Sequence, residues 1–213
     1  MERTWIRVGA FAGLIGTLAY FIVILTPAPL IAQVLLVTVW GLCISVGAPG
    51  LYYLLALNRK TVSLQIGVAS SAVAGVVALT MLIVQMSVNT AVIPMIEAPP
   101  EGASEATVRA AWIVVDQVQL GLDIVWDIYL CLSALLIAWN MRSHPRFGVI
   151  FSVTGVLIAG ALFAFNMATF PVPPANAGSV DLGPLIGLWF LAVTIQVFRS
   201  FSWADMALAD HRG

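Results

Sequence analysis

Six long stretches of the chain are almost wholly apolar, and short polar or proline-rich segments separate them. A transmembrane helix needs about 20 mostly apolar residues, because the hydrocarbon core of a bilayer is about 30 Å thick and each helical residue rises about 1.5 Å. We therefore predict an all-α, polytopic integral membrane helical bundle in which residues 1–213 form a single transmembrane domain. The predicted spans cover residues 5–25, 30–57, 62–93, 108–139, 147–170 and 184–198.

The composition agrees with a membrane protein. Of the 213 residues, 61% are hydrophobic and only 9% are charged, whereas a soluble domain carries about 25% charged residues. The formal net charge is -1, so the chain offers no basic surface that would neutralise phosphates, and nucleic acid is excluded as a partner. The partner that the composition predicts is the lipid bilayer itself.

The basic residues predict the orientation, because cytoplasmic loops retain Lys and Arg. With both termini in the cytoplasm, only Arg109 lies outside, and the remaining basic residues are all cytoplasmic. Those residues are Arg3, Arg7, Arg59, Lys60, Arg142, Arg146, Arg199 and Arg212. The first span begins like a signal peptide, but its apolar part, residues 8–25, is longer than the 7–15 residues of a typical signal core. We expect it to be retained; cleavage would leave five spans.

Small residues four apart, such as Gly9 and Gly13 or Gly155 and Ala159, recur in the spans. They allow helix backbones to approach closely, which predicts a compact bundle. The second span contains Gly47-Ala48-Pro49-Gly50, and a proline flanked by glycines predicts a kink or a break there.

The fourth span carries the strongest functional signal. Asp116, Asp123 and Asp127 are spaced by seven and four residues, so at 3.6 residues per turn they share one helix face. With the span at 108–139, Asp123 is expected near the middle of the bilayer. A charged aspartate there costs at least about 2.5–3.5 kcal/mol, so we expect the three side chains to face the bundle interior. A structural hydrogen-bond network between helices is the alternative interpretation.

Other polar residues are candidates to line a cavity beside this face. Gln119 flanks the aspartates and joins them as a candidate site for a proton or a monovalent cation, while Arg109 and Trp112 lie toward the outer end of the same line. The other cavity-lining candidates are Gln85 and Asn89 in the third span, Asn166 in the fifth and Gln33 in the second.

Several chemistries lack the residues that they need. The histidines, His144 and His211, fall outside the predicted spans, so histidine-ligated haem in the bilayer and Ser-His or Cys-His catalysis are not supported. Phosphate-binding loops and zinc-ligand spacings are absent from the sequence. The sequence gives no positive support for an enzyme, no cofactor is identified, and the metal-binding status is unknown.

The last third of the chain carries Pro145-Arg146-Phe147-Gly148 and Gly187-Leu188-Trp189-Phe190. In these runs it resembles a bacterial group of uncharacterised six-helix integral membrane proteins, which is defined as a domain of unknown function. The resemblance implies a six-helix bundle and a bacterial inner membrane, and it supplies no catalytic or binding residues.

We therefore predict a small membrane transporter or ion-translocating protein that uses the aspartate face as a proton or cation relay. The alternative is an accessory or assembly subunit of a larger membrane complex, in which the acids meet a basic or metal-bearing helix of a partner. A homo-oligomer, by contrast, would favour the transport hypothesis. A membrane sensor with an external cation site at residues 97–105 is a third hypothesis.

Overall fold

The computed structural model describes residues 1–172, 174 and 177–210, and this part of the chain is helical with no strand. The predicted all-α class is confirmed. The helices are α1 (Glu2–Leu25), α2 (Leu30–Ala56), α3 (Val62–Glu97), α4 (Glu105–Met141), α5 (Gly148–Thr169), α6 (Gly183–Arg199) and α7 (Phe201–Asp210).

Five of the described helices, α1 to α5, are each long and apolar enough to cross a membrane. The shorter α6 is followed by α7 at a bend of 55°, and the two together would make a sixth span. The helix boundaries agree with the predicted spans to within a few residues. The helix α7 lies beyond the last predicted span, residues 184–198, and was not predicted.

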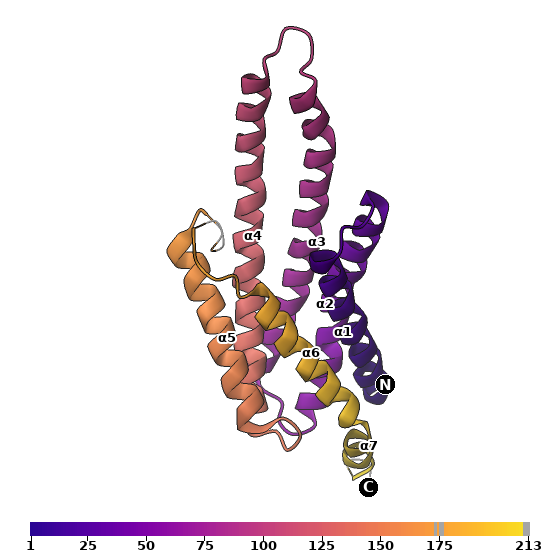
Figure 1. Ribbon diagram of the computed structural model, residues 1–213. Helices are drawn as coiled ribbons and strands as arrows, with labels where there is room; N and C mark the ends of the chain where they lie inside the picture. Colours follow the sequence, from indigo (N-terminus) through magenta and orange to yellow (C-terminus); the bar gives the residue numbers. More distant parts are fainter. Residues whose placement is uncertain (173, 175–176, 211–213) are drawn as a thin grey trace.

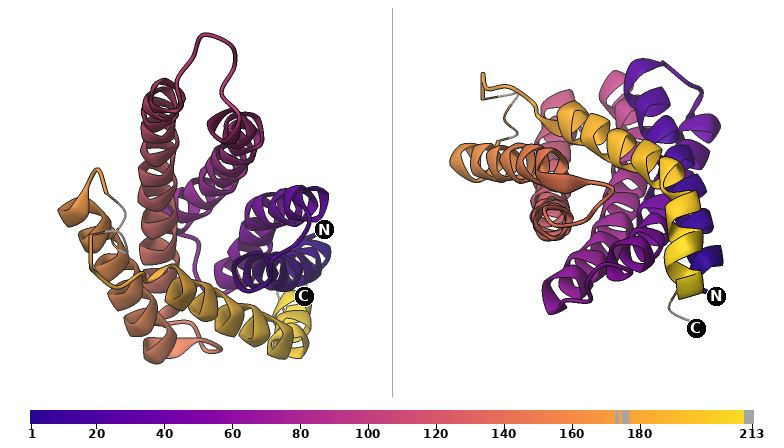
Figure 2. Two further views of the ribbon diagram at one scale, coloured as in Figure 1. Left: turned by 45° about the horizontal axis from the view of Figure 1, so that its top comes forward. Right: turned by 90° about the horizontal axis from the view of Figure 1, so that it is seen from below.

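The longest helices, α3 and α4, form a hairpin that stands beyond the ends of the others (Figure 1). The α1–α2 hairpin packs on the α3 side, and α5 packs on the opposite side against α4. The helix α6 crosses from α5 to α1 and so joins the two halves of the bundle (Figures 1 and 2).

One end of the bundle gathers both chain termini and most of the basic residues, and we call it the basic end. Arg3 Nη2 lies 2.7 Å from Asp205 Oδ2, which ties α1 to α7. The α2–α3 and α4–α5 connections meet there, since Asn58 Nδ2 donates to the carbonyl of Ser143. The α3–α4 connection, which carries Glu101, lies at the opposite end, which we call the acidic end (Figure 1).

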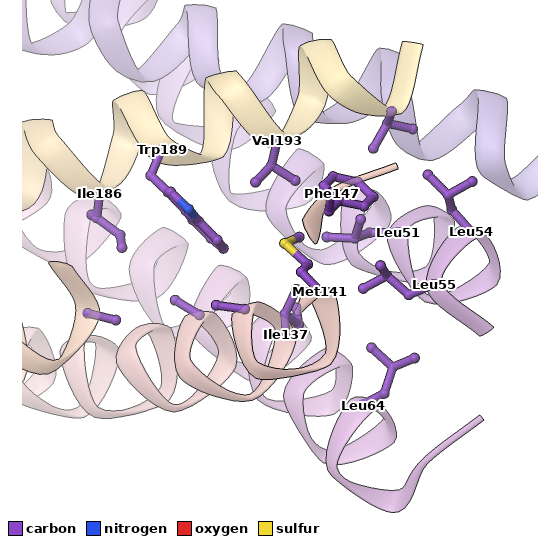
Figure 3. Close-up of a cluster of buried hydrophobic side chains, with 14 of the residues drawn as sticks. Leu51, Leu54, Leu55, Leu64, Ile137, Met141, Phe147, Ile186, Trp189 and Val193 are labelled. Atoms are coloured by element: carbon purple, nitrogen blue, oxygen red, sulfur yellow. The ribbon is translucent and has the colours of Figure 1, made fainter. Parts of the chain in front are cut away.

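The apolar core joins α2, α3 and α4 to α6 (Figure 3). Leu54 of α2, Leu64 of α3 and Met141 of α4 are fully buried, and Trp189 and Val193 reach this core from α6. Between membrane helices such contacts stabilise through close van der Waals packing, because lipid tails are as apolar as leucine. The packed core therefore fixes the crossing of α6, which also positions the residues described below.

The predicted small-residue contacts occur between helices of one chain. A Cβ on Gly9 of α1 would lie 2.5 Å from Cα of Gly50 in α2. The helix α2 continues through Pro49 without interruption, so of the predicted kink or break the break does not occur, and the kink stays a prediction. The close contact with α1 holds this turn helical although Pro49 lacks a backbone N–H.

His144 lies in the α4–α5 connection and is 1% exposed. Its Nε2 is 3.3 Å from the carbonyl of Leu54, and its Nδ1 accepts a hydrogen bond from the backbone N–H of Arg146. The ring packs edge-on against Trp203 of α7. Burial, together with the positive charge of Arg146, lowers the pKa of His144 to about 4 although the contact with Leu54 opposes this shift.

Thr61 begins α3 and also links it to α4. Its Oγ1 accepts from the backbone N–H of Leu64 and donates to Oδ1 of Asn140 at 2.6 Å. We expect Thr61→Ala to lower the free energy of unfolding by about 1–2 kcal/mol, because a helix cap and a side-chain hydrogen bond are both lost. Thr61→Ser keeps the hydroxyl and should lose less than half as much, as measured by thermal unfolding in detergent.

Candidate functional site

The aspartate face of α4 is turned toward the rest of the bundle. Asp127 and Gln119 are buried, and Asp116 and Asp123 are half-buried. Further along α4 the same face carries the buried core residues Leu130, Ala134, Ile137 and Met141. The exposed positions of this part of α4, such as Val114 and Val118, lie on other faces.

Asp123 and Asp127 lie near the middle of α4 and level with the end of the shorter α5. Cys131 of α4 lies against the backbone of Phe163, and a Cβ on Gly155 would lie 2.7 Å from Cβ of Ala138. Because α4 and α5 are antiparallel, this register sets Asp127 about one turn before the end of α5 and Asp123 level with that end.

The sequence interpretation set Asp123 near the centre of the bilayer, and that depth stays a prediction; within the bundle, Asp123 is level with the end of α5 and not with its middle. The helix α4 has 37 residues, which is about 55 Å of helix and far longer than a 30 Å hydrocarbon core. The midpoint of α4 is therefore not the midpoint of the shorter helices around it.

Tyr20 of α1 and Asp181, just before α6, complete this polar region. Asp181 is within electrostatic range of Asp123 and Asp127, and Tyr20 is within range of Asp127 and Asp181. The two side chains flank Gly183: a Cβ there would lie 3.1 Å from Oδ1 of Asp181 and 3.4 Å from the Tyr20 hydroxyl. Asp181 Oδ1 also accepts from the backbone N–H of Gly183 at 2.8 Å, which anchors the start of α6. We call Asp123, Asp127, Asp181 and Tyr20 the acidic cluster.

The three aspartates of α4 have no cationic partner within the described part of the chain. Asp127 is 5% exposed, and the ion pairs there are formed by Arg3, Arg7 and Arg109 with other acids. Among the described residues, no side-chain hydrogen bond involves Asp116, Asp123 or Asp127 either. A buried carboxylate without a compensating cation is costly, so a bound proton or a bound cation is the expected means of compensation.

A cavity of about 110 Å³ begins beside the acidic cluster and lies between α1, α2, α4 and α6. At its acidic end it is lined by Tyr20, Trp126 and Gly183, and further in by Gly9 and Val197. Gly183 and Val197 are about 21 Å apart along α6 at 1.5 Å per residue. The cavity is therefore elongated and has its polar groups mainly at one end.

Aromatic rings form the wall of the cavity near the acidic cluster. Tyr20 and Trp40 have ring centroids 5.3 Å apart, and Trp40 and Trp126 meet edge-to-face at 5.7 Å. The indole Nε1 of Trp126 is buried without a hydrogen-bond acceptor. Buried donors without an acceptor are uncommon in folded proteins. In this wall of the cavity, the protein's own polar groups leave the indole N–H of Trp126 without a hydrogen bond.

The remaining candidate residues do not meet in one site, and each makes a contact of its own. Arg109 pairs with Glu105 at 2.7 Å rather than with Asp116, and Trp112 Nε1 donates to Oδ1 of Asn89 at 3.4 Å. Asn166 is buried and donates to the carbonyl of Leu162.

Gln33 and Asn89 border a second, shallower hollow between α2 and α3. Asp116, Gln85 and Asn166 do not line it. The predicted common cavity leading to Asp116 is therefore replaced by two separate hollows, because the α3–α4 hairpin extends away from α5 and α6 (Figure 1).

Tyr20, Trp40, Trp126 and Asp181 were missed as site residues by the sequence reasoning. Tyrosine and tryptophan are common near membrane interfaces, so their residue types gave no specific signal. Asp181 is the one acid in the connection between α5 and α6, and that isolation was the available indication. No metal-holding group of three or more His, Cys, Asp or Glu side chains occurs among the described residues.

No protein-family model matches the chain, and no curated protein and no solved structure is detectably similar to it. The resemblance to uncharacterised bacterial six-helix membrane proteins therefore stays a prediction.

Proposed function

We propose that the protein is a small membrane transporter or ion-translocating protein, in which Asp123 and Asp127 bind a proton or a monovalent cation. The observation that carries this proposal is Asp127: its side chain is 5% exposed, it faces other acids, and it lacks a basic partner among the described residues. Intramembrane acids with this environment typically belong to proton or ion pathways. A purely structural role would give little stability for the cost of burial, since interhelical polar contacts average about 0.6 kcal/mol.

In this proposal the protein crosses a bacterial inner membrane six times with both termini in the cytoplasm. The clustering of Arg3, Arg7, Arg59, Lys60, Arg142, Arg146 and Arg199 at the basic end supports this orientation. The acidic cluster then lies on the outer side. Asp116 and Gln119, further toward the acidic end on the same helix face, are the outer relay positions.

The test is ion flux in vesicles that contain the purified protein and a trapped pH-sensitive dye. We expect the wild-type protein to dissipate a pH gradient, or to couple a sodium or potassium gradient to one, faster than protein-free vesicles do. Asp127→Asn and Asp123→Asn should lower the rate to that of protein-free vesicles, because an amide cannot exchange a proton or compensate a cation.

Glu105→Gln is the matched control, because Glu105 lies on the same helix, is exposed and pairs only with Arg109. It should leave the flux unchanged. Two results would contradict the proposal: wild-type flux equal to that of empty vesicles with all three ions, or full flux in a correctly folded Asp127→Asn protein.

The α3–α4 hairpin favours a second candidate function, an accessory subunit of a membrane complex. Its part beyond the other helices exposes large apolar side chains, including Ile93, Met95, Ile113 and Val114. A partner helix packed on this hairpin would cover them. Mild-detergent purification from the native membrane, with photo-crosslinking from position 114, distinguishes the candidates: a stoichiometric crosslinked partner favours the accessory role.

A further inference from the structure

The cavity beside the acidic cluster is open to a ligand of a particular shape. It is elongated, its wall is mainly apolar, and Gly9, Gly13 and Gly16 of α1 lie along it. A proton or a bare metal cation needs no such space. The cavity therefore matches a ligand with an apolar body.

No charged side chain of the described residues lines the cavity itself. The acids lie next to one end of it, where a Cβ on Gly183 would lie 3.1 Å from Oδ1 of Asp181 and 3.4 Å from the Tyr20 hydroxyl. Asp127, buried and without a partner in the described chain, lies in the acidic cluster with Tyr20, and Tyr20 and Gly183 line the cavity mouth. The nearest basic residue along α4 is Arg109, which pairs with Glu105 and lies about 21 Å from Asp123 at 1.5 Å per residue. The local field at the mouth is negative, so a positively charged group is favoured there.

The aromatic wall supplies a second means of binding a cation. Trp40 contacts both Tyr20 and Trp126 next to the acids. Aromatic faces attract ammonium groups, most strongly when the site is shielded from water. Carboxylates and aromatic rings together are suited to an organic ammonium rather than to a small hydrated metal ion.

We propose that the cavity binds a lipophilic monocation: an ammonium head lies at the acidic cluster, and an apolar tail extends between α1, α2 and α6 toward Val197. This assignment rests on the proposed function, because it names the substrate class of the same acidic site. In this assignment the buried carboxylates bind the ammonium head, and the glycine-lined cavity selects for an apolar tail.

Binding is tested with three probes on the full-length protein in phosphatidylcholine nanodiscs: octyltrimethylammonium, tetramethylammonium and octanol. Octyltrimethylammonium carries both head and tail, and the other two carry one each. We expect saturable binding of octyltrimethylammonium by equilibrium dialysis, at least tenfold tighter than either partial probe after correction for empty nanodiscs. Equal affinity for octanol and octyltrimethylammonium would overturn the proposal.

Variants test whether octyltrimethylammonium binds at the acidic cluster. Asp127→Asn and Asp123→Asn should each weaken octyltrimethylammonium binding at least tenfold while octanol binding stays the same, and Glu105→Gln should match the wild type. Unchanged affinity in both folded aspartate variants would overturn the proposal. If a variant does not fold, the comparison of the three probes on the wild-type protein still tests the proposal.

Cys43 offers an independent test of where the tail lies, because it lines the cavity and is half-buried. Cys131 does not line the cavity and is buried. In a Cys131→Ala background, octyltrimethylammonium should slow alkylation of Cys43 by N-ethylmaleimide at least threefold, and octanol should not. Equal rates with and without the cation would contradict the assignment. The two proposals fail separately: ion flux without cation binding refutes only this assignment, and cation binding without flux refutes only transport.

Discussion

Lowering the pH from 7 to about 4.5 should reduce the free energy of unfolding by roughly 2–3 kcal/mol through His144 alone. Both hydrogen bonds of this ring are satisfied only by the neutral form, in which Nε2 donates to Leu54 and Nδ1 accepts from Arg146. Its pKa in the folded protein is about 4, against about 6.5 for an unfolded chain. Between these values the unfolded chain binds more protons, so the stabilisation is complete above pH 6.5 and is lost as the pH falls toward 4.

The measurement is thermal unfolding of the detergent-solubilised protein at several pH values, followed by near-UV circular dichroism. The aspartates and glutamates also titrate at acid pH, so the comparison is between the pH dependence of the wild type and that of His144→Gln. The variant keeps a side-chain N–H but does not titrate, and its stability should fall by roughly 2–3 kcal/mol less over the same interval. Parallel pH profiles would show that His144 is not the acid-sensitive group.

Gly9→Ala should lower the free energy of unfolding by about 1–3 kcal/mol, the usual cost of overpacking. The added Cβ would lie 2.5 Å from Cα of Gly50 and 2.9 Å from the carbonyl oxygen of Gly47. Both are backbone atoms, so α1 and α2 must separate to accommodate the methyl group. The separation would also change the wall of the cavity, which both helices line.

Gly160→Ala is the matched control for this substitution. Gly160 lies inside α5, and a Cβ there meets nothing within 4 Å. The same exchange at this position should leave the stability unchanged or raise it by up to about 1 kcal/mol, because alanine favours a helix over glycine. Equal losses for the two variants, measured by thermal unfolding in one detergent, would contradict the importance of the α1–α2 contact.

The apolar pattern predicted most of the fold because bilayer thickness constrains the length of each span. The predicted spans 62–93 and 108–139 were already longer than a 30 Å layer, but the pattern did not show which part of them stands beyond the other helices, since valine, isoleucine and alanine are equally apolar inside and beyond that layer. Pro49 predicted a kink or a break, and the break does not occur, because the tertiary contact between Gly9 and Gly50 overrides a local preference.

The candidate site was predictable only along one helix. The shared face of Asp116, Asp123 and Asp127 follows from helical periodicity, and the structure turns that face toward the bundle. The approach of Tyr20 and Asp181 depends on how α1 and α6 cross α4, which no local spacing encodes. The separation of Arg109 from Asp116 has a simpler cause: Glu105, four residues before Arg109, offers a closer carboxylate.

The ion pairs that Asp205 of α7 makes with Arg3 and Arg7 of α1 constrain how copies of this protein can be joined. Because the first and last helices meet at the same end (Figure 1), a tandem gene that encodes two copies in series needs only a flexible hydrophilic linker. Both halves of such a fusion would insert in the same direction. A linked pair would therefore reproduce a parallel arrangement and never an inverted one.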